Sequence, residues 1–311
     1  MSALRVVAPG FLTTVQDLGR PGHAAAGVSA SGAADTLALR IGNRLVGNGD
    51  DAPGLEMTML GGSFLFEAEV IFALTGSDPE ARLGDRSVAP WRPCRARAGD
   101  TLVCGALNGG ARSYLCVAGG IAVPLVFASA STHLLTGMGG FEGRALRADD
   151  RLLIGAARAG APFNREIDPS SIPGYRQGEP FRTTEGPQAT WFAPETRAAF
   201  YDTPWRVAEA CDRMGIRLSG PPIRLAEARE LATEGVLSGA IQVPPGGLPI
   251  VLFVEHQTTG GYPKVANVIS ADLARLGGVG PRDTMRFEPI SIAAARAILR
   301  AQREALDALF F

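Results

Sequence analysis

The sequence Pro249-Ile250-Val251-Leu252-Phe253-Val254 is an uninterrupted apolar run, and the polar stretch His256-Gln257-Thr258-Thr259-Gly260-Gly261-Tyr262-Pro263-Lys264 follows it closely. A short apolar run that ends at turn residues is typical of a buried strand. Adjacent glycines let the backbone adopt positive φ values and direct several N–H groups toward one point. The stretch predicts either a functional site directly behind a buried strand or an ordinary turn with solvated side chains.

The composition is that of a globular protein with many short strands. The chain has 311 residues, of which 46% are hydrophobic and 20% charged, with 39 glycines and 22 prolines. This abundance of turn residues favours β structure over a helical bundle.

The formal net charge of −1 gives no reason to expect nucleic acid or an anionic membrane as a partner. No leader precedes the first apolar segment and no apolar run is long enough to span a membrane, so we expect a cytoplasmic protein.

The sequence does not predict a metal site. The three histidines, His23, His133 and His256, lie far apart and lack the spacing of ligands on one helix. The four cysteines show no C-x-x-C pattern, and most of them lie in strand-like apolar segments. We therefore expect packed free thiols rather than metal ligands or disulfides.

The pattern of turns predicts two lobes. Short apolar segments separated by glycine-rich turns fill residues 54–153, which is typical of a sandwich or closed barrel. We expect an N-terminal β-barrel lobe at 1–158, a linker at 159–180 and a C-terminal lobe at 181–311. Residues 292–309 are rich in alanine and arginine and predict an amphipathic terminal helix.

A second polar cluster lies near the N-terminus. Gln16, Asp17 and Arg20 surround a glycine, and Ser31 and Asp35 follow shortly afterwards. Apolar residues then recur with helical spacing, so we predict a helix that starts near residue 34 and is capped by Ser31 or Gly32. Asp35 would lie in its first turn, where a carboxylate suits the helix dipole. Asp35 therefore has a purely structural interpretation beside the functional one.

The two polar clusters together contain the groups needed to bind and polarise a small amide or carboxylate. Glutamine amides both donate and accept hydrogen bonds, Arg20 and Lys264 can hold an anion, and glycine N–H groups can stabilise an oxyanion. Lys264 is the only lysine of the chain. His256 is the natural proton carrier near neutral pH, although a histidine beside a strand is also often a hydrogen-bonded structural residue. No nucleotide-binding or nucleophile-elbow motif is present.

Several motifs in register resemble the allophanate hydrolase subunit 2 family. They cover nearly the whole chain: Thr14-Val15-Gln16-Asp17-Leu18-Gly19-Arg20, Ser31-Gly32-Ala33-Ala34-Asp35, Asn43-Arg44-Leu45-Val46-Gly47-Asn48, Asp212-Arg213-Met214-Gly215, Gly239-Ala240-Ile241-Gln242-Val243-Pro244 and Gln257 through Pro263. The resemblance implies a mainly β fold with some α structure, built as two packed halves with cyclophilin-like β-barrel lobes. It also implies a companion of the subunit 1 family whose surface completes the site.

The resemblance also implies an activity. The family includes a subunit of ATP-dependent 5-oxoprolinase, which hydrolyses the cyclic amide 5-oxo-L-proline to L-glutamate, so we expect a hydrolase subunit that works with B-like and A-like partners, with ATP used by the complex. The family also includes a part of the carboxyltransferase domain of urea carboxylase, for which carboxybiotin would arrive on a partner. A third alternative is a regulatory binding subunit without catalysis.

Two segments depart from the family pattern. Ala128-Ser129-Ala130-Ser131-Thr132 stands where the family usually has Gly-Ser-Arg-Ser-Thr, so an arginine is absent there. Gly277-Gly278 and Pro281-Arg282-Asp283 stand where an alanine-glutamine pair and Pro-Gly-Asp are expected. These departures bear on the substrate more than on the fold.

The candidate site residues form two groups. We assign the catalytic role to His256, Gln257, Tyr262 and Lys264. We assign substrate binding to Gln16, Asp17, Arg20, Ser31, Asp35, Gln242, Thr258, Thr259, Gly260 and Gly261. We expect the two clusters to form the two sides of one composite cleft for a small amide substrate.

Overall fold

The computed structural model describes residues 2–158, 167 and 174–310, and these form two compact units. The first unit contains the residues up to Arg20 together with Ser31–Gly174, and the second contains Pro21–Ala30 together with Tyr175–Phe311. The segment 159–180 that we predicted as a linker lies largely outside the described residues. The predicted lobe boundaries at residues 158 and 181 therefore stay a prediction.

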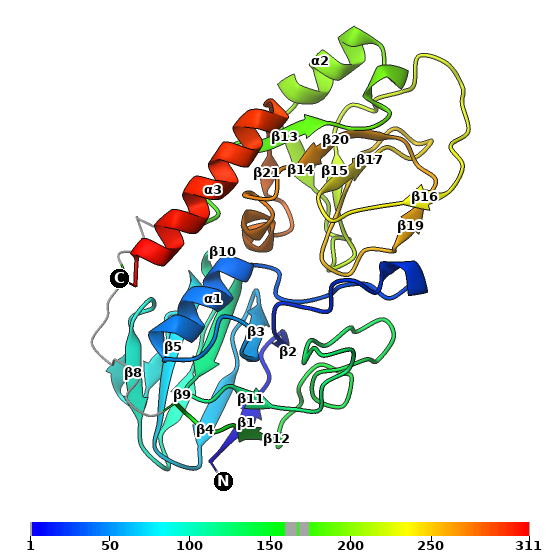
Figure 1. Cartoon of the computed structure of the whole chain (residues 1–311). Coiled ribbons are helices and arrows are strands. Elements are labelled where there is room, and N and C mark those ends of the chain that lie inside the picture. Colours follow the sequence, from blue (N-terminus) through cyan, green and yellow to red (C-terminus); the bar gives the residue numbers. More distant parts are fainter. Residues whose placement is uncertain (1, 159–166, 168–173, 311) are drawn as a thin grey trace. The chain divides into compact units, whose positions relative to one another are not determined.

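The described residues of the first unit form two β-sheets and the helix α1 (Figure 1). A seven-stranded sheet has the order β11-β12-β1-β4-β9-β6-β7, and a five-stranded sheet has the order β2-β3-β10-β5-β8. The elements are β1 (Ala3–Ala8), β2 (Leu12–Gln16), α1 (Thr36–Leu45), β3 (Gly54–Thr58), β4 (Ser63–Phe66), β5 (Val70–Asp78), β6 (Arg82–Leu83), β7 (Arg86–Ser87), β8 (Pro93–Ala96), β9 (Thr101–Val103), β10 (Asn108–Val117), β11 (Ile121–Ala122) and β12 (Arg151–Ile154).

The core of this unit lies between the two sheets. Leu4 and Phe64 of the seven-stranded sheet and Phe72 and Leu115 of the five-stranded sheet are fully buried and belong to one hydrophobic cluster. Because strand side chains alternate between the two faces of a sheet, each sheet contributes one apolar face to this core. The β signal predicted for residues 54–153 is confirmed.

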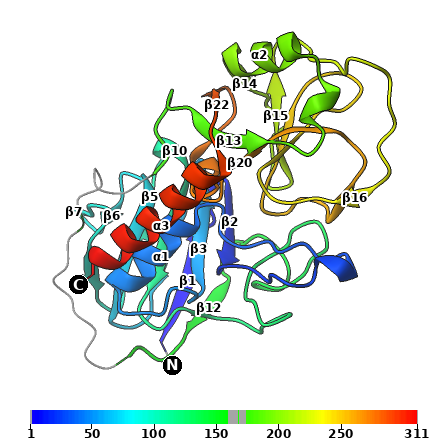
Figure 2. The ribbon, with the colours of Figure 1, turned by 45° about the horizontal axis from the view of Figure 1, so that its top comes forward.

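Helix α1 covers β5 and β10 of the five-stranded sheet, as Figures 1 and 2 show. Its apolar residues Leu37, Ile41 and Leu45 are buried. The prediction that Ser31 or Gly32 caps this helix is wrong, because the cap is Asp35 itself. Its carboxylate accepts hydrogen bonds from the N–H groups of Leu37 and Ala38, which have no partner within the helix.

The second unit is built on one eight-stranded sheet with the order β21-β14-β15-β18-β17-β20-β13-β22, and a separate two-stranded ribbon, β16-β19, lies beside it. Its elements are the 3-10 helix Ala24–Ala26, β13 (Phe181–Glu185), the 3-10 helix Ala189–Trp191, α2 (Pro194–Asp202), β14 (Trp205–Val207), β15 (Gly215–Ser219), β16 (Glu234–Gly235), β17 (Ala240–Gln242), β18 (Ile250–Leu252), β19 (Thr259–Gly260), β20 (Lys264–Val268), the 3-10 helix Ala274–Gly278, β21 (Thr284–Met285), β22 (Phe287–Pro289) and α3 (Ile292–Ala308).

Two predicted elements of this unit are confirmed. The apolar run that precedes the polar stretch contains β18, which pairs with β15 on one side and β17 on the other. Its residues Val251 and Leu252 are buried. The terminal helix is α3, and the hydroxyl of its N-cap residue Ser291 accepts a hydrogen bond from the N–H of Ala294.

The fold is mainly β with a nearly closed, barrel-like sheet, as predicted.

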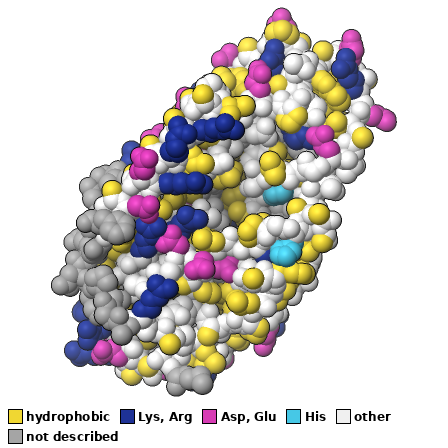
Figure 3. All heavy atoms as spheres, in the orientation of Figure 1, with side chains coloured by type: hydrophobic (Ala, Val, Ile, Leu, Met, Phe, Trp, Pro, Cys, Tyr) yellow, Lys and Arg dark blue, Asp and Glu magenta, His cyan; other side chains and the backbone are white. Residues whose placement is uncertain are grey.

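Within the described residues, no helix combines the length and the apolar character needed to cross a membrane. Positively and negatively charged side chains are interspersed over the face shown in Figure 3, in keeping with the formal net charge of −1.

Candidate functional site

The polar stretch behind β18 is held in place by the β16-β19 ribbon. In this ribbon Glu234 pairs with Gly260, and Gly235 pairs with Thr259. The chain then enters β20 at Lys264. The ribbon therefore brings Glu234, which lies thirty residues before Lys264 in the sequence, to the beginning of β20.

Lys264 and Glu234 form an ion pair. The side chain of Lys264 is only 4% exposed, whereas that of Glu234 is 40% exposed. Gln188 connects the two residues, since its Nε2 donates to Glu234 Oε1 at 3.1 Å and its Oε1 accepts from the Lys264 backbone N–H at 3.1 Å. The Lys264 ammonium holds the pKa of Glu234 below its usual value. A buried ammonium needs such a partner, because desolvation of an unpaired charge is costly.

Two glutamine side chains meet beside Gly260. Nε2 of Gln257 donates a long hydrogen bond of 3.4 Å to Oε1 of Gln242. Gln242 is 1% exposed, and its Nε2 has no hydrogen-bond partner among the described residues. A Cβ atom on Gly260 would lie 2.7 Å from Nε2 of Gln242 and 3.5 Å from Nε2 of Gln257. Glycine at this position therefore allows the Gln242 amide to approach the backbone, whereas the distance to Gln257 is an ordinary contact.

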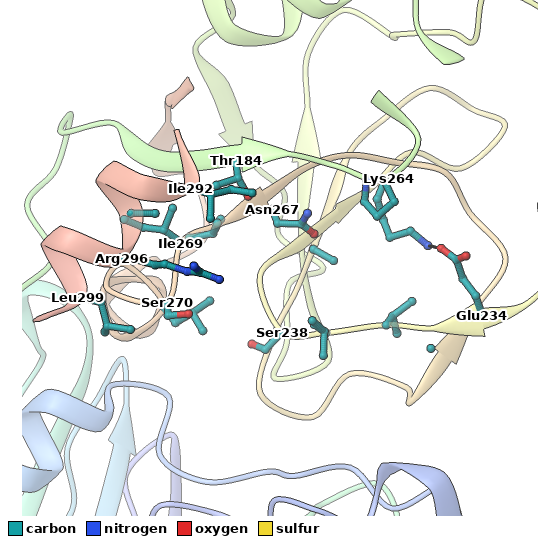
Figure 4. A pocket seen from close by; sticks show the side chains of 18 residues that line it. Thr184, Glu234, Ser238, Lys264, Asn267, Ile269, Ser270, Ile292, Arg296 and Leu299 are labelled. Atoms are coloured by element: carbon teal, nitrogen blue, oxygen red, sulfur yellow. Dashed lines mark hydrogen bonds and ion pairs between the residues drawn. The ribbon is translucent and has the colours of Figure 1, made fainter. Parts of the chain in front are cut away.

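Lys264 and Glu234 line a cavity of about 370 Å³ in the second unit (Figure 4). Its walls are mainly apolar and come from β13, β17, β20, the segment 234–238, residues 269–273 and α3. The polar lining groups include Thr184, Asn267 and Arg296. Cavities of this volume, with apolar walls and few polar groups, are typical of sites for small organic ligands.

The other residues of the polar stretch lie outside this cavity. Tyr262, which is 44% exposed, and Gly261 line a second cavity of about 540 Å³. His256 places Nδ1 2.6 Å from the carbonyl oxygen of Gln257, and burial lowers its pKa below the usual value. The carbonyl of Thr258 accepts from the N–H of Val236, and the side chain of Thr259 is exposed on β19. The structure therefore places Tyr262 and Lys264 in two different cavities.

In the first unit, Asp17 organises a buried hydrogen-bond network. Its carboxylate accepts from Ser129 Oγ at 2.7 Å, from the Ala130 N–H at 2.6 Å and from Ser131 Oγ at 2.5 Å. Arg20 is 1% exposed and donates to the carbonyls of Val126 and Ser131. This network fixes the loop around residues 126–132 against the end of β2. Asp17 and Arg20 thus have internal partners.

Gln16 and Ser31 contact the same loop. Nε2 of Gln16 donates to the Thr132 carbonyl at 3.1 Å, and Oγ of Ser31 donates to the same carbonyl at 2.9 Å. Gln16, Asp17, Arg20, Ser31 and Asp35 belong to the first unit, and His256 to Lys264 belong to the second. The composite cleft stays a prediction.

Asp35 lies in a buried acidic cluster with Glu56 and Tyr114. Tyr114 Oη donates to Glu56 Oε2 at 2.8 Å and accepts from the Asp35 N–H at 2.7 Å. Burial raises the pKa of Asp35 to about 7, and the nearby Glu56 carboxylate adds to this effect. The geometry gives Asp35 a clear structural task as the cap of α1.

Glu234 and Gln188 are absent from the sequence-based candidates. Glu234 lies in a glycine- and threonine-containing stretch without apolar periodicity, and Gln188 lies 76 residues before Lys264. The one sequence feature that pointed to this pair is Lys264, the only lysine of the chain. The structure shows that it is buried, and a buried ammonium needs a partner of opposite charge. Among the described residues, no group of three or more histidine, cysteine, aspartate or glutamate side chains has the arrangement to hold a metal ion.

Comparison with known proteins places the chain in a family. Residues 26–289 match the model of the carboxyltransferase domain, subdomain A and B. The chain is 40% identical over 310 residues to the C subunit of 5-oxoprolinase of Escherichia coli, covering 98% of this chain and 97% of that protein. It is 36% identical to the C subunit of 5-oxoprolinase of Haemophilus influenzae, covering 94% of this chain and 93% of that protein.

Larger proteins carry the same domain. The urea amidolyase of Lachancea kluyveri is 34% identical over 99% of this chain, which spans only 18% of that protein. The solved structure of the K. lactis urea amidolyase superimposes with a TM-score of 0.92 and 31% identity, over 99% of this chain and 20% of that one. The chain therefore belongs to the carboxyltransferase domain family that urea amidolyase and the C subunit of 5-oxoprolinase share.

Proposed function

We propose that this chain is the C-type subunit of an ATP-dependent 5-oxoprolinase, a cytoplasmic hydrolase complex completed by B-like and A-like subunits. The main support is the 40% identity to the C subunit of the Escherichia coli enzyme, which extends over nearly the full length of both proteins. The paired Lys264 and Glu234 at the edge of an apolar cavity supply a site of suitable chemistry.

In the proposed reaction the complex uses ATP to phosphorylate the lactam oxygen of 5-oxo-L-proline, and water then opens the ring to release L-glutamate, ADP and phosphate. The phosphoryl group that passes from ATP to the lactam oxygen carries negative charge throughout this step. The ammonium of Lys264 can stabilise that charge, because a fixed cation in an apolar site acts with little screening. Glu234 holds the ammonium in the ion pair, and Gln188 holds Glu234 and the backbone N–H of Lys264.

Gln242 and Gln257 have a second proposed role. The Nε2 of Gln242 is aimed at Gly260 and has no partner among the described residues, and the link between the two amides is long. Such an incompletely satisfied pair can rearrange to bond an amide group when a ligand enters. We propose that these glutamines orient the amide of the substrate next to Lys264.

The test is ATP-dependent release of glutamate from 5-oxo-L-proline by the reconstituted subunits, with and without this chain. We expect glutamate release only when the chain is present. When the Lys264→Met variant is used in place of the wild-type chain, the rate of release should fall at least about 100-fold, which corresponds to roughly 3 kcal/mol of transition-state stabilisation. Unchanged release without the chain overturns the proposed function. Circular dichroism of Lys264→Met verifies that the fold is retained.

A second candidate function is carboxyl transfer from carboxybiotin to urea or a similar amide. It is supported by the 34% identity and the TM-score of 0.92 to urea amidolyases. Lys264 is buried and ion-paired and follows Tyr262-Pro263, so it does not fit as a biotin attachment site, and biotin would be carried by a partner. Biotin- and bicarbonate-dependent carboxylation of urea by the co-expressed subunits would favour this alternative.

A further inference from the structure

The cavity that contains Lys264 has an uncompensated positive charge. Among the described residues that line it, three carry a formal charge: Glu234, Lys264 and Arg296. Glu234 and Lys264 neutralise each other in their ion pair. The lining therefore keeps a net charge of +1, contributed by Arg296.

Arg296 has no carboxylate partner among the described residues. The residues three and four positions away on α3, which are its neighbours on the helix surface, are Ile292, Ala293, Leu299 and Arg300. None of these carries a negative charge, and Arg300 is a like charge. Within the part of the chain that the structure describes, the Arg296 guanidinium forms no ion pair or hydrogen bond with another element of the unit.

The position of Arg296 directs its charge into the cavity. Figure 4 shows its side chain reaching from α3 into the cavity, on the side opposite Lys264 and Glu234, with Asn267 of β20 between the two ends in this view. Ile269, Ile292 and Leu299 form apolar walls around Arg296. Basic side chains along α3 are also visible in Figure 3, but Arg300 and Arg303 do not line the cavity.

We propose that Arg296 is the residue that recognises a carboxylate in this cavity. The ligand class is a small organic acid that also carries an amide: its carboxylate binds the Arg296 guanidinium, and its amide is directed toward Asn267 and the Lys264–Glu234 end. Arginine suits this task, because its planar guanidinium binds a carboxylate through two parallel hydrogen bonds. The proposal rests on the proposed function, for which it defines how the substrate is selected.

The proposal is tested with two lactams that differ only in the carboxylate. The reconstituted complex is assayed with 5-oxo-L-proline, the acidic lactam, and with 2-pyrrolidinone, the uncharged lactam, which is used as a substrate or, if it is not opened, as a competitive inhibitor. For Arg296→Met we expect the KM of the acidic lactam to rise at least about tenfold with little change in kcat. The KM or Ki of the uncharged lactam should be unchanged.

Arg300→Met is the matched control, since Arg300 is exposed like Arg296 and lies one turn along α3 but does not line the cavity. It should leave the kinetics of both lactams as in the wild type. An unchanged KM in Arg296→Met, or an equal loss for both lactams, overturns the proposal. An effect of equal size in Arg300→Met would also overturn it, because it would indicate a general charge effect of α3.

A binding measurement separates this proposal from the proposed function. In the full-length chain labelled with ¹⁵N, the Arg296 Nε–H signal, assigned by its loss in Arg296→Met, should shift on addition of 5-oxo-L-proline and not on addition of 2-pyrrolidinone. A shift together with absent turnover would overturn the 5-oxoprolinase function and keep the carboxylate site. If the complex turns over 5-oxo-L-proline, but the Arg296 signal does not shift and Arg296→Met does not change the KM, the carboxylate site is overturned and the 5-oxoprolinase function is kept.

Discussion

Lys264 at the start of β20 forms an ion pair with Glu234 of β16, and a shared contact with Gln188 fixes both. The lysine is almost fully buried, whereas the glutamate is partly open to solvent and lines the same cavity. This arrangement keeps an ammonium in an apolar environment while its counter-ion stays accessible. The ion pair therefore joins the β16-β19 ribbon to β20, and the same two side chains line the cavity in which we propose that the substrate binds.

Glu234→Gln should destabilise the chain, because it leaves the buried ammonium of Lys264 without a counter-ion. We expect a loss of about 1–3 kcal/mol, less than for a fully buried pair because Glu234 is partly exposed. Urea unfolding at neutral pH measures it. Glu304→Gln, on the exposed face of α3, is the control and should change stability by less than about 0.5 kcal/mol.

The same pair predicts a dependence on pH. Since Lys264 lowers the pKa of Glu234, the pair stabilises the folded state at pH values above the ordinary carboxyl pKa. This contribution is lost as the pH falls through the lowered pKa. The difference in stability between wild type and Glu234→Gln should therefore shrink in acid. A difference that stays constant from neutral to strongly acidic pH would contradict this account.

Gly260→Ala should reduce activity more than stability. The added Cβ would lie 2.7 Å from Nε2 of Gln242, a contact that real Cβ atoms do not tolerate, so the glutamine amide must move. Gly235→Ala is a matched control in the same ribbon, because nothing lies within 4 Å of its Cβ position. Glutamate release by the reconstituted complex should fall at least about tenfold for the first variant only. Equal rates of glutamate release for Gly260→Ala and Gly235→Ala would show that the position of the Gln242 amide does not affect the activity.

Asp35→Asn should abolish part of the pH dependence of stability. Burial raises the pKa of Asp35 from 3.8 to about 7, so the folded state binds a proton that the unfolded state has already lost. This contribution to stability is complete below pH 3.8 and is lost as the pH rises toward 7. Asparagine keeps the helix cap without a charge to bury.

Denaturation at several pH values measures this effect. Above neutral pH, Asp35→Asn should be more stable than the wild type by roughly 2–4 kcal/mol, and the advantage should vanish in acid. Asp85→Asn, at an exposed turn, is the control and should follow the wild type. A variant that is less stable than the wild type above neutral pH would show that the Asp35 anion stabilises the folded state, and would contradict this account.

Gly140→Ala should strongly destabilise the first unit. Its Cβ would lie 1.9 Å from Oγ1 of Thr132, whose hydroxyl is buried and bonded to the carbonyl of Val15. Gly84 has the same φ of +58°, but no atom lies near its Cβ position. Gly84→Ala should cost about 1 kcal/mol from backbone strain, and Gly140→Ala about 3 kcal/mol or more. Thermal unfolding compares the two, and equal losses would contradict the steric explanation.

Local sequence patterns predicted the regular elements of this protein well. The periodic apolar residues of α1 and α3 and the apolar run of β18 each correspond to an observed element. Such patterns are informative because burial of one face is decided by residues that are close in sequence. The cap of α1 was predicted at the wrong residue, since Ser31, Gly32 and Asp35 all have suitable chemistry and only the backbone conformation selects among them.

The sequence by itself determined the mainly β fold, the family and the solitary Lys264 as a residue of interest. Only the tertiary structure decided which groups surround that lysine, because Glu234 and Gln188 reach it over 30 and 76 residues of chain. In the same way, Asp17 finds its serine partners more than a hundred residues later. Hydrogen bonds and ion pairs act over a few ångströms in space, and strand pairing brings together residues that no local pattern connects.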